Sequence, residues 1–241
     1  MRRKEQYKGF SLAEVLIAVG TLAIGMIFIG GTFLTGVYFS TLSTERTIAA
    51  SVADEAFAKI RLYGIDPADT SLTADQLVPF DTLNTTITDD EFAYPSTKTA
   101  TDKQYYWSAL CRSIRSDPTN HLVQVTVFAS RKIGSATTYP GGTTRPVPVK
   151  VGVSASGAGN QNQLTITNAD EQSYINGGCT IADNETGLLY RVMQRDDDAP
   201  NVITLDKAWT GSTTDSVWVI PPPTGGGRAP CIAVYQKLIR F

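Results

Sequence analysis

Histidine and cysteine are scarce in this 241-residue chain, which has one histidine, His121, and three cysteines. A single histidine leaves little room for a Ser-His-Asp catalytic arrangement, and no CxxC or Cys/His spacing indicates a zinc site. The chain also has no GxSxG, Walker or HExxH motif, and no GxGxxG after a predicted strand. We therefore expect a protein that is not an enzyme and binds no cofactor, in which His121 is an ordinary surface or core residue.

Basic residues are missing from a long stretch near the N-terminus, where no Lys or Arg lies between Lys8 and Arg46. The first nine residues, "MRRKEQYKG", hold four basic residues against one acid and so have a net charge of +3. Because the whole chain has a formal net charge of −2, the other 232 residues carry −5. A mildly acidic body gives no reason to expect general nucleic-acid binding.

The stretch without basic residues contains an apolar run, from Val15 to Phe39, that at about 25 residues is long enough to cross a bilayer. It is too long for the apolar region of a secretory signal peptide, and no small-x-small cleavage site follows it. The basic segment before the run predicts a cytoplasmic N-terminus and a single crossing of the membrane. Glu14 stands at the start of the run, and because burying a carboxylate in a bilayer costs about 2.5–3.5 kcal/mol, a plain anchor leaves this acid unexplained.

The segment around Glu14, "KGFSLAEVLIAVGTLAIGM", resembles the N-terminus of type IV pilin-like proteins, which include type IV pilins, minor pilins and type II secretion pseudopilins. Gly9 matches the last residue of the family's leader peptide, Phe10 the first mature residue and Glu14 the glutamate at the fifth mature position. The resemblance implies that a prepilin peptidase cuts between Gly9 and Phe10 and N-methylates the new amine of Phe10. It favours a minor pilin or minor pseudopilin, because Gly31 stands where major pilins often have proline.

The resemblance also implies a role for Glu14 in subunit docking. Cleavage would create a protonated α-amine on Phe10, and in the family the glutamate of an incoming subunit meets the terminal amine of a subunit already in the filament. An opposite charge offsets much of the cost of burying either group in an apolar setting. The alternative is that Glu14 only reaches the membrane interface. The implied partners are a prepilin peptidase, other pilin or pseudopilin subunits, an inner-membrane assembly platform and a cytoplasmic ATPase.

A second apolar pattern follows the membrane run. In "ERTIAASVADEAFAKIRLYG" the apolar residues recur three and four positions apart, which is typical of an amphipathic helix. Gly64 suits the position just after a helix, and Pro67 cannot continue one. We therefore expect one helix from about Ser11 to Tyr63, with a first half that is apolar all round and a second half that packs one face on a domain.

The rest of the chain is expected to form a loop and a β-rich head. Residues 65–103 are rich in Thr, Asp and Pro without strand or helix periodicity, which predicts a connecting loop. From residue 104 onward, β-branched and alternating runs predict eight strands, within residues 104–114, 121–132, 147–155, 163–169, 187–194, 201–209, 215–222 and 231–241. The polar turn "RDDDAP" is expected to join its two flanking strands as a hairpin.

We therefore predict an α+β fold in which a long N-terminal helix, membrane-spanning in its first half and amphipathic in its second, packs on a C-terminal antiparallel β-sheet head. The predicted segments are a basic leader peptide (1–9), a transmembrane or filament-core helix (10–39), the amphipathic half of the helix (40–64), the connecting loop (65–103) and the β-rich head (104–241). Eight strands exceed a minimal pilin head, so we expect extra strands or a second small sheet.

The cysteines of the head offer one disulfide in an oxidising compartment. Any of the three pairings among Cys111, Cys179 and Cys231 is open from the sequence. Cys179 and Cys231 both lie near predicted loops, and their pairing would resemble the staple that family members often have in this region. Cys111 lies in an apolar strand and is expected to be a buried thiol.

Two charged groups of the head are candidates for binding sites. Asp196, Asp197 and Asp198 lie in the predicted hairpin turn and are weak candidates for calcium, which some major pseudopilins bind in a C-terminal loop, although solvated turn acids are the better explanation. The second group lies on two adjacent predicted strands and would favour DNA if it formed one basic stripe, against the alternative of scattered surface charge. Its members are Arg112, Arg115, Arg131 and Lys132.

The sequence thus favours a structural subunit of a type IV pilus-like filament or type II secretion pseudopilus. We expect it first in the inner membrane, with a cytoplasmic N-terminus, and then in a periplasmic or extracellular filament. One alternative is an adhesin or DNA-uptake minor pilin with a ligand-binding head. The other is an uncleaved, signal-anchored envelope protein, which would lack both processing and filament assembly.

Overall fold

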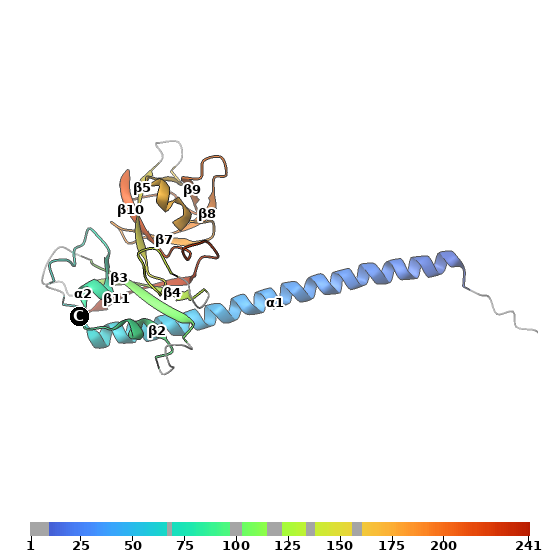
Figure 1. The fold of residues 1–241 in the computed structure, drawn as a ribbon, viewed down its shortest axis with the longest axis horizontal. Helices are drawn as coiled ribbons and strands as arrows, with labels where there is room; N and C mark the ends of the chain where they lie inside the picture. The colour runs from blue at the N-terminus through green and yellow to red at the C-terminus, as the bar shows by residue number, and fades with distance from the viewer. Residues whose placement is uncertain (1–9, 67–68, 97–102, 115–121, 134–137, 156–160) are drawn as a thin grey trace, which may run out of the picture. The chain divides into compact units, whose positions relative to one another are not determined.

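The computed structural model describes residues 10–66, 69–96, 103–114, 122–133, 138–155 and 161–241. Its internal contacts divide the chain into two compact units, which meet between Glu45 and Arg46. The first unit is helical throughout its described part, apart from its first two residues. The second unit contains a five-stranded antiparallel sheet and a closed six-stranded barrel (Figure 1). A long helix followed by an antiparallel β domain confirms the α+β class.

The helix α1 runs from Leu12 to Tyr63, which is 52 residues or about 78 Å at 1.5 Å per residue. It ends where the sequence predicts, because Gly64 takes a φ of 75°, which favours glycine, and donates from its N–H to the Ile60 carbonyl at 3.0 Å. The amide of Asn84 then donates to the carbonyl oxygens of Tyr63 and Gly64, both at 3.1 Å. Carbonyls that a helix end leaves unpaired are thus satisfied by the next segment.

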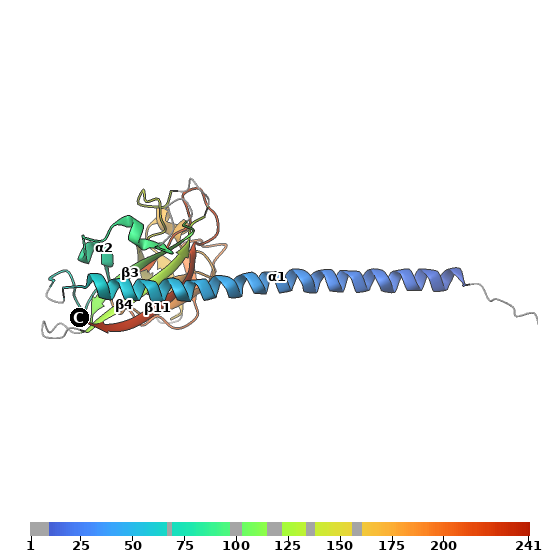
Figure 2. The same ribbon diagram turned by 90° about the horizontal axis from the view of Figure 1, so that it is seen from below.

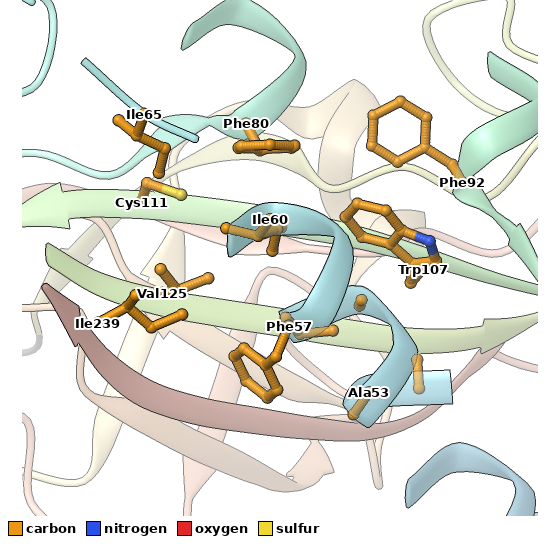
Figure 3. Close-up of a cluster of buried hydrophobic side chains, with 14 of the residues drawn as sticks. Ala53, Phe57, Ile60, Ile65, Phe80, Phe92, Trp107, Cys111, Val125 and Ile239 are labelled. Atoms are coloured by element: carbon orange, nitrogen blue, oxygen red, sulfur yellow. The ribbon is translucent and has the colours of Figure 1, made fainter. Parts of the chain in front are cut away.

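The five-stranded sheet, which we call the head sheet, has the order β1-β3-β4-β11, with β2 also paired to β3. Its strands are β1 (Val78–Pro79), β2 (Ala93–Tyr94), β3 (Tyr105–Ser113), β4 (Leu122–Arg131) and β11 (Cys231–Arg240). The amphipathic part of α1 packs on one face of this sheet, as the predicted stripe of apolar residues requires (Figures 2 and 3). Phe57 and Ile60 of the helix pack among Trp107, Val125 and Ile239 of the sheet.

Residues 69–96 contain more regular structure than the predicted connecting loop. They contain β1 and β2 as well as two short helices, α2 (Phe80–Leu83) and η1 (Asp89–Phe92). The buried indole of Trp107 donates to the Glu91 carbonyl at 3.0 Å and lies 4.7 Å from the ring centre of Phe92. Lys59 of α1 makes an ion pair with the Glu91 carboxylate at 2.9 Å. The segment is therefore held between the helix and the sheet.

The closed barrel has the strand order β10-β5-β6-β9-β8-β7, and β7 pairs with β10 to complete it. Its strands are β5 (Val149–Ala155), β6 (Gln163–Ile166), β7 (Thr180–Asp183), β8 (Leu189–Arg195), β9 (Val202–Leu205) and β10 (Thr214–Val219), with the short helix η3 (Ala169–Tyr174) after β6. Aliphatic and aromatic side chains fill its interior. The pairing of β8 with β9 confirms the predicted hairpin around "RDDDAP".

The barrel is an insertion between two neighbouring strands of the head sheet. Strands β4 and β11 pair along their length although the whole barrel lies between them in the sequence. At the base of the insertion, Arg131 N–H donates to the Pro230 carbonyl at 2.9 Å. Extra strands were expected, but their closure into a barrel was not, because it depends on the pairing of β7, which the sequence patterns did not reveal.

The turn between β7 and β8, residues 184–188, joins the barrel to the head sheet, and we call it the junction turn. The Arg112 guanidinium of β3 donates to the Glu185 carbonyl at 2.7 Å, and the Gln236 amide of β11 donates to the Gly187 carbonyl at 2.7 Å. Leu77 N–H donates to the Asn184 carbonyl at 2.9 Å. Beside the turn, a small cluster of apolar side chains also connects the barrel to the head sheet. Its buried members are Leu77, Leu110, Phe128, Ala182, Trp218 and Ile220.

Truncating Trp107 tests whether the core between helix and sheet stabilises the head. We expect Trp107→Ala to lower the free energy of unfolding by about 3–5 kcal/mol, because it leaves a cavity and removes the donor to the Glu91 carbonyl. Trp107→Phe should cost less, about 1–2 kcal/mol, since most of the ring volume remains and Lys59 still donates to that carbonyl at 2.6 Å. Urea unfolding of the full chain in detergent, followed by near-UV circular dichroism, measures both. An unchanged midpoint for Trp107→Ala would contradict this role.

Candidate functional site

The start of α1 is built as a reciprocal cap that includes Glu14. Ser11 precedes the first helical residue, and its hydroxyl oxygen accepts from Ala13 N–H at 3.2 Å. Glu14 Oε2 in turn accepts from Ser11 N–H at 3.0 Å. This is the capping box that the spacing Ser-x-x-Glu produces at a helix N-terminus. Phe10, just before it, is 87% exposed, whereas Gly9 lies outside the described residues.

The cap places a negative charge where the helix favours one. The first turn of a helix has unpaired N–H groups and a partial positive charge, so a carboxylate there is stabilising. A protonated amine on Phe10 would sit at the same end, where the helix dipole disfavours a positive charge. Glu14 therefore completes the cap at the start of α1.

The apolar surface of α1 from Leu12 to Phe39 is bare. The large apolar side chains of this part are at least half exposed, and no other part of the described chain covers them, whereas Leu42 is half-buried and Glu45 is buried. The most exposed are Leu12, Ile27, Phe28, Ile29, Phe33 and Leu34. This part of α1 is long and apolar enough to cross a membrane. A helix surface that is apolar all round is typical of a segment surrounded by apolar groups and not by water.

Small and hydroxyl side chains of the same segment also suit an apolar surrounding. Five glycines lie in it, at positions 20, 25, 30, 31 and 36, and a Cβ on any of them would meet no described atom within 4 Å. They therefore fill no packing role within the chain, although each costs up to about 1 kcal/mol of helix stability in water. The hydroxyls of Thr21, Thr32, Thr35, Thr41 and Thr44 all donate to carbonyls one turn back. Hydroxyls paired in this way need no water.

The three cysteines are free thiols in the structure, and they lie in different surroundings. Cys111 is fully buried in the core between α1 and the head sheet, and burial raises its thiol pKa. Cys231 lies on the opposite side of that sheet, in the apolar cluster near the junction turn, while Cys179 faces the barrel interior. Burial raises the pKa of Cys179 to about 11, and burial together with the nearby Cys179 raises that of Cys231 to about 12. The pairing of Cys179 with Cys231 therefore stays a prediction, since all three cysteines are free thiols here.

The acidic triplet at 196–198 forms an exposed turn. Asp196 Oδ1 accepts from Asp198 N–H at 2.9 Å and from Ala199 N–H at 3.2 Å, which stabilises the turn between β8 and β9. Asp197 and Asp198 are exposed as well. In the parts of the chain that the structure describes, no group of three or more His, Cys, Asp and Glu side chains is placed to hold a metal ion.

The basic residues of β3 and β4 do not form one stripe. Arg112 pairs with Gln124 and Arg131 with Tyr105, so the two arginines stand at opposite ends of the hairpin, about 23 Å apart at 3.3 Å per residue. The Arg112 guanidinium is also occupied, because it donates to Gln124 at 2.8 Å and to two backbone carbonyls. Arg112 and Arg131 therefore do not share one stripe, in agreement with the alternative of scattered surface charge, while Arg115 and His121 lie outside the described residues.

The head has a cavity that the sequence did not indicate. It has a volume of about 730 Å³ and lies among four segments, which are the turn around Tyr139, the end of η3, the end of β8 and the loop from β10 to β11. Among the described residues that line it, only Arg195 is charged. Its Nε donates to the Pro200 carbonyl at 2.6 Å and its Nη1 donates to the Gln172 carbonyl at 2.9 Å. The other polar lining side chains are uncharged hydroxyls, an amide and two tyrosines.

Comparison with known proteins gives no family for this chain. A scan against models of protein families, a search of curated proteins and a search of solved structures each found no match.

Oxidation tests the cysteine pair. We expect the full chain, incubated with oxidised glutathione in detergent, to form one disulfide between Cys179 and Cys231. The two thiols would lose two protons and two electrons, and the oxidant would be reduced to two glutathione thiols. Non-reducing peptide mapping should find this link, with Cys111 unreactive until the chain is denatured, because a buried thiol of raised pKa reacts slowly.

Matched serine variants control this experiment. Cys111→Ser should form the same link, whereas Cys179→Ser should leave the Cys231 thiol free. A disulfide that includes Cys111, or three thiols remaining after prolonged oxidation, would contradict the predicted pairing.

Proposed function

We propose that the chain is a structural subunit of a pilus-like filament or pseudopilus, assembled through its N-terminal helix after removal of residues 1–9. The observation that carries the proposal is the Glu14 carboxylate at the first turn of a helix whose apolar surface nothing in the described chain covers. The resemblance around Gly9, Phe10 and Glu14 supplies the processing step. The subunit would be a minor one, which a head enlarged by an inserted barrel suits.

A membrane-anchored precursor explains the bare surface before assembly. The basic leader stays in the cytoplasm by the positive-inside rule, and a membrane peptidase cuts at Gly9–Phe10 and methylates the new amine. In the filament, helices of other subunits replace lipid around residues 12–39. The uncovered glycines suit this exchange, because small residues allow close approach between helices in an apolar setting.

Glu14 would act by changing partners. Before assembly its carboxylate accepts from Ser11 N–H of its own helix. On docking, the protonated amine of a neighbouring Phe10 would approach the same carboxylate, and a charge-assisted hydrogen bond is stronger than one from a neutral amide. Loss of the cap costs about 0.5–2 kcal/mol. The free energy gained from the ion pair therefore needs to exceed only the small cost of losing the cap. The ion pair also sets the axial position of the incoming subunit.

Three variants separate the charge of Glu14 from its capping role. Glu14→Gln keeps the cap, since glutamine serves equally in a capping box, but removes the charge. Ser11→Ala keeps the charge and removes half of the cap. We expect cells with the peptidase and platform to process Glu14→Gln, Glu14→Ala and Ser11→Ala after Gly9. Only Ser11→Ala should enter filaments at a level within about twofold of the unaltered chain, because an exposed cap contributes about 1 kcal/mol.

Mass spectrometry of the processed chain and immunoblots of sheared filaments provide the two measurements. An intact Met1 start, or cleavage C-terminal to the apolar run, would exclude the pilin proposal and favour a signal-anchored protein. Normal incorporation of Glu14→Gln would instead refute only the pairing of charges.

A second candidate function, a ligand-binding head, is favoured by the cavity around Arg195. A volume of about 730 Å³ is in the usual range for small-ligand sites. Tyr174 offers a ring face, while Ser173, Asn176 and Thr224 offer hydroxyl and amide groups. Arg195 is held in place by two carbonyls, and a guanidinium so fixed suits a carboxylate. The lining therefore fits a short acidic saccharide.

Titration with trigalacturonate, and with a neutral galactose trimer as the comparison, tests this second function. We expect the full chain in detergent to bind the acidic trimer by calorimetry and Arg195→Gln to weaken binding by at least about tenfold, since a charge-assisted pair contributes about 1.5–3 kcal/mol. Arg191→Gln is the matched control, because Arg191 is exposed on the same strand and does not line the cavity. Equal binding of both trimers, or of neither, would contradict the assignment.

A further inference from the structure

Two aspartates face each other inside the mouth of the barrel. Asp183 ends β7 and is fully buried, and it stands opposite Val217 of β10. Asp215 lies two residues before Val217 on the same strand, so its side chain is on the same face of the sheet. The Asp183 carboxyl lies close enough to Asp215 to raise its pKa. We call Asp183 and Asp215 the carboxyl pair.

The hydrogen bonds of the pair show which carboxyl needs a proton. Asp183 Oδ1 accepts from Glu185 N–H at 3.0 Å, and its Oδ2 accepts from the Thr186 hydroxyl. Asp215 Oδ1 accepts from Ser216 N–H at 2.6 Å, but Asp215 Oδ2 is buried without a partner among the described residues. An unpaired buried acceptor beside another acceptor is costly. A proton on Asp215 converts that oxygen into a donor to Asp183 and removes the cost.

The charges around the carboxyl pair also favour a proton on Asp215. Glu185 adds a negative charge beside Asp215, and the positive charge that acts on Asp183 is the Arg112 guanidinium of β3. The neighbours of Asp215 on β5, from Gly152 to Ser154, carry no titratable side chain. Burial, followed by the neighbouring Asp183 carboxyl, raises the pKa of Asp215 to about 6. The proton therefore belongs on Asp215.

The carboxyl pair lies between two segments that depend on it. One is the junction turn, whose N–H and hydroxyl groups bind Asp183 and whose carbonyls bind the head sheet. The other is residues 206–213, between β9 and β10, where Ser212 donates to Glu185 Oε2 at 2.5 Å. Gly211 of this loop passes so close that a Cβ would lie 3.1 Å from Asp183 Oδ2 and 2.6 Å from the Trp209 ring.

We propose that the carboxyl pair is a proton-operated latch, in which protonated Asp215 donates to Asp183 and holds the junction turn and residues 206–213 together. Loss of the proton leaves two facing carboxylates beside Glu185, and their repulsion loosens both segments. The attachment of the barrel to the head sheet is then firm in acidic surroundings and looser near neutral pH. The latch lies wholly within the head, so it does not rest on the filament proposal.

The direction of the pH effect follows from linkage. A carboxyl whose pKa is raised by folding stabilises the folded state most below its unfolded value near 4, and this contribution is lost as the pH rises through the folded value. For Asp215 the folded value is about 6. The head should therefore be more protected at about pH 5 than at about pH 7.5, the reverse of what an ion-paired aspartate would cause.

Hydrogen exchange of the full chain in detergent tests the latch, with rates corrected for the intrinsic effect of pH. We expect peptides from 183–188 and 206–216 to exchange roughly tenfold faster, relative to intrinsic rates, at about pH 7.5 than at about pH 5, while the core of β3 and β4 changes little. Asp215→Asn, whose amide donates as the protonated acid does, should keep both segments protected at both pH values. Carbon-13 NMR of the labelled aspartates gives the titration of Asp215 directly.

Asp197→Asn is the matched control, because it removes the same charge from an exposed turn of the barrel. It should respond to pH as the unaltered chain does. The latch is refuted by equal protection of the unaltered chain at both pH values, by a pH response that persists in Asp215→Asn, or by an Asp215 resonance that titrates near 4.

Discussion

The bare apolar surface of residues 12–39 is the constraint on which the rest of the molecule depends. A helix that is apolar all round requires a surrounding without water, and the described chain provides none. From Arg46 the same helix buries only one face, with Ala49, Val52, Ala56 and Ile60 fully buried against the head core. The helix α1 therefore has a first part that needs an apolar surrounding and a second part that packs one face on the head core. The change from a full apolar surface to a single stripe marks the boundary between these two parts.

The head sheet and its helix form a complete unit to which the barrel has been added. Strands β4 and β11 are neighbours, and Arg131 and Pro230 close the base of the insertion. The barrel has its own interior, and it meets the sheet through the junction turn and a small apolar cluster. An inserted module attached in this way can change its own stability without disturbing the helix-packed core. This separation is why a carboxyl pair at the junction can respond to pH while the head sheet remains folded.

The sequence patterns predicted the structural features that depend on residues close together in the chain. They missed the features that depend on residues far apart in the chain. The apolar spacing at 48–60 predicted the packed face of α1, and all eight predicted strands are present. β7 has only four residues, and its pairing with β10 closes the barrel. The capping box could have been found, since Ser11 and Glu14 have the required spacing. The carboxyl pair could not, because its aspartates are far apart in sequence and only barrel closure brings them together.

The carboxyl groups of Glu14 and Asp215 differ in the hydrogen-bond donors that surround them. Glu14 stands at a helix start, where N–H groups are unpaired by construction, and its carboxylate accepts from Ser11 N–H. Asp215 Oδ2 meets no donor among the described residues and faces a second carboxylate, so a proton is the least costly partner. On the proposed function, the first acid has an exchangeable partner, which the amine of another subunit can replace. The second can exchange only its proton, so assembly acts on one acid and pH on the other.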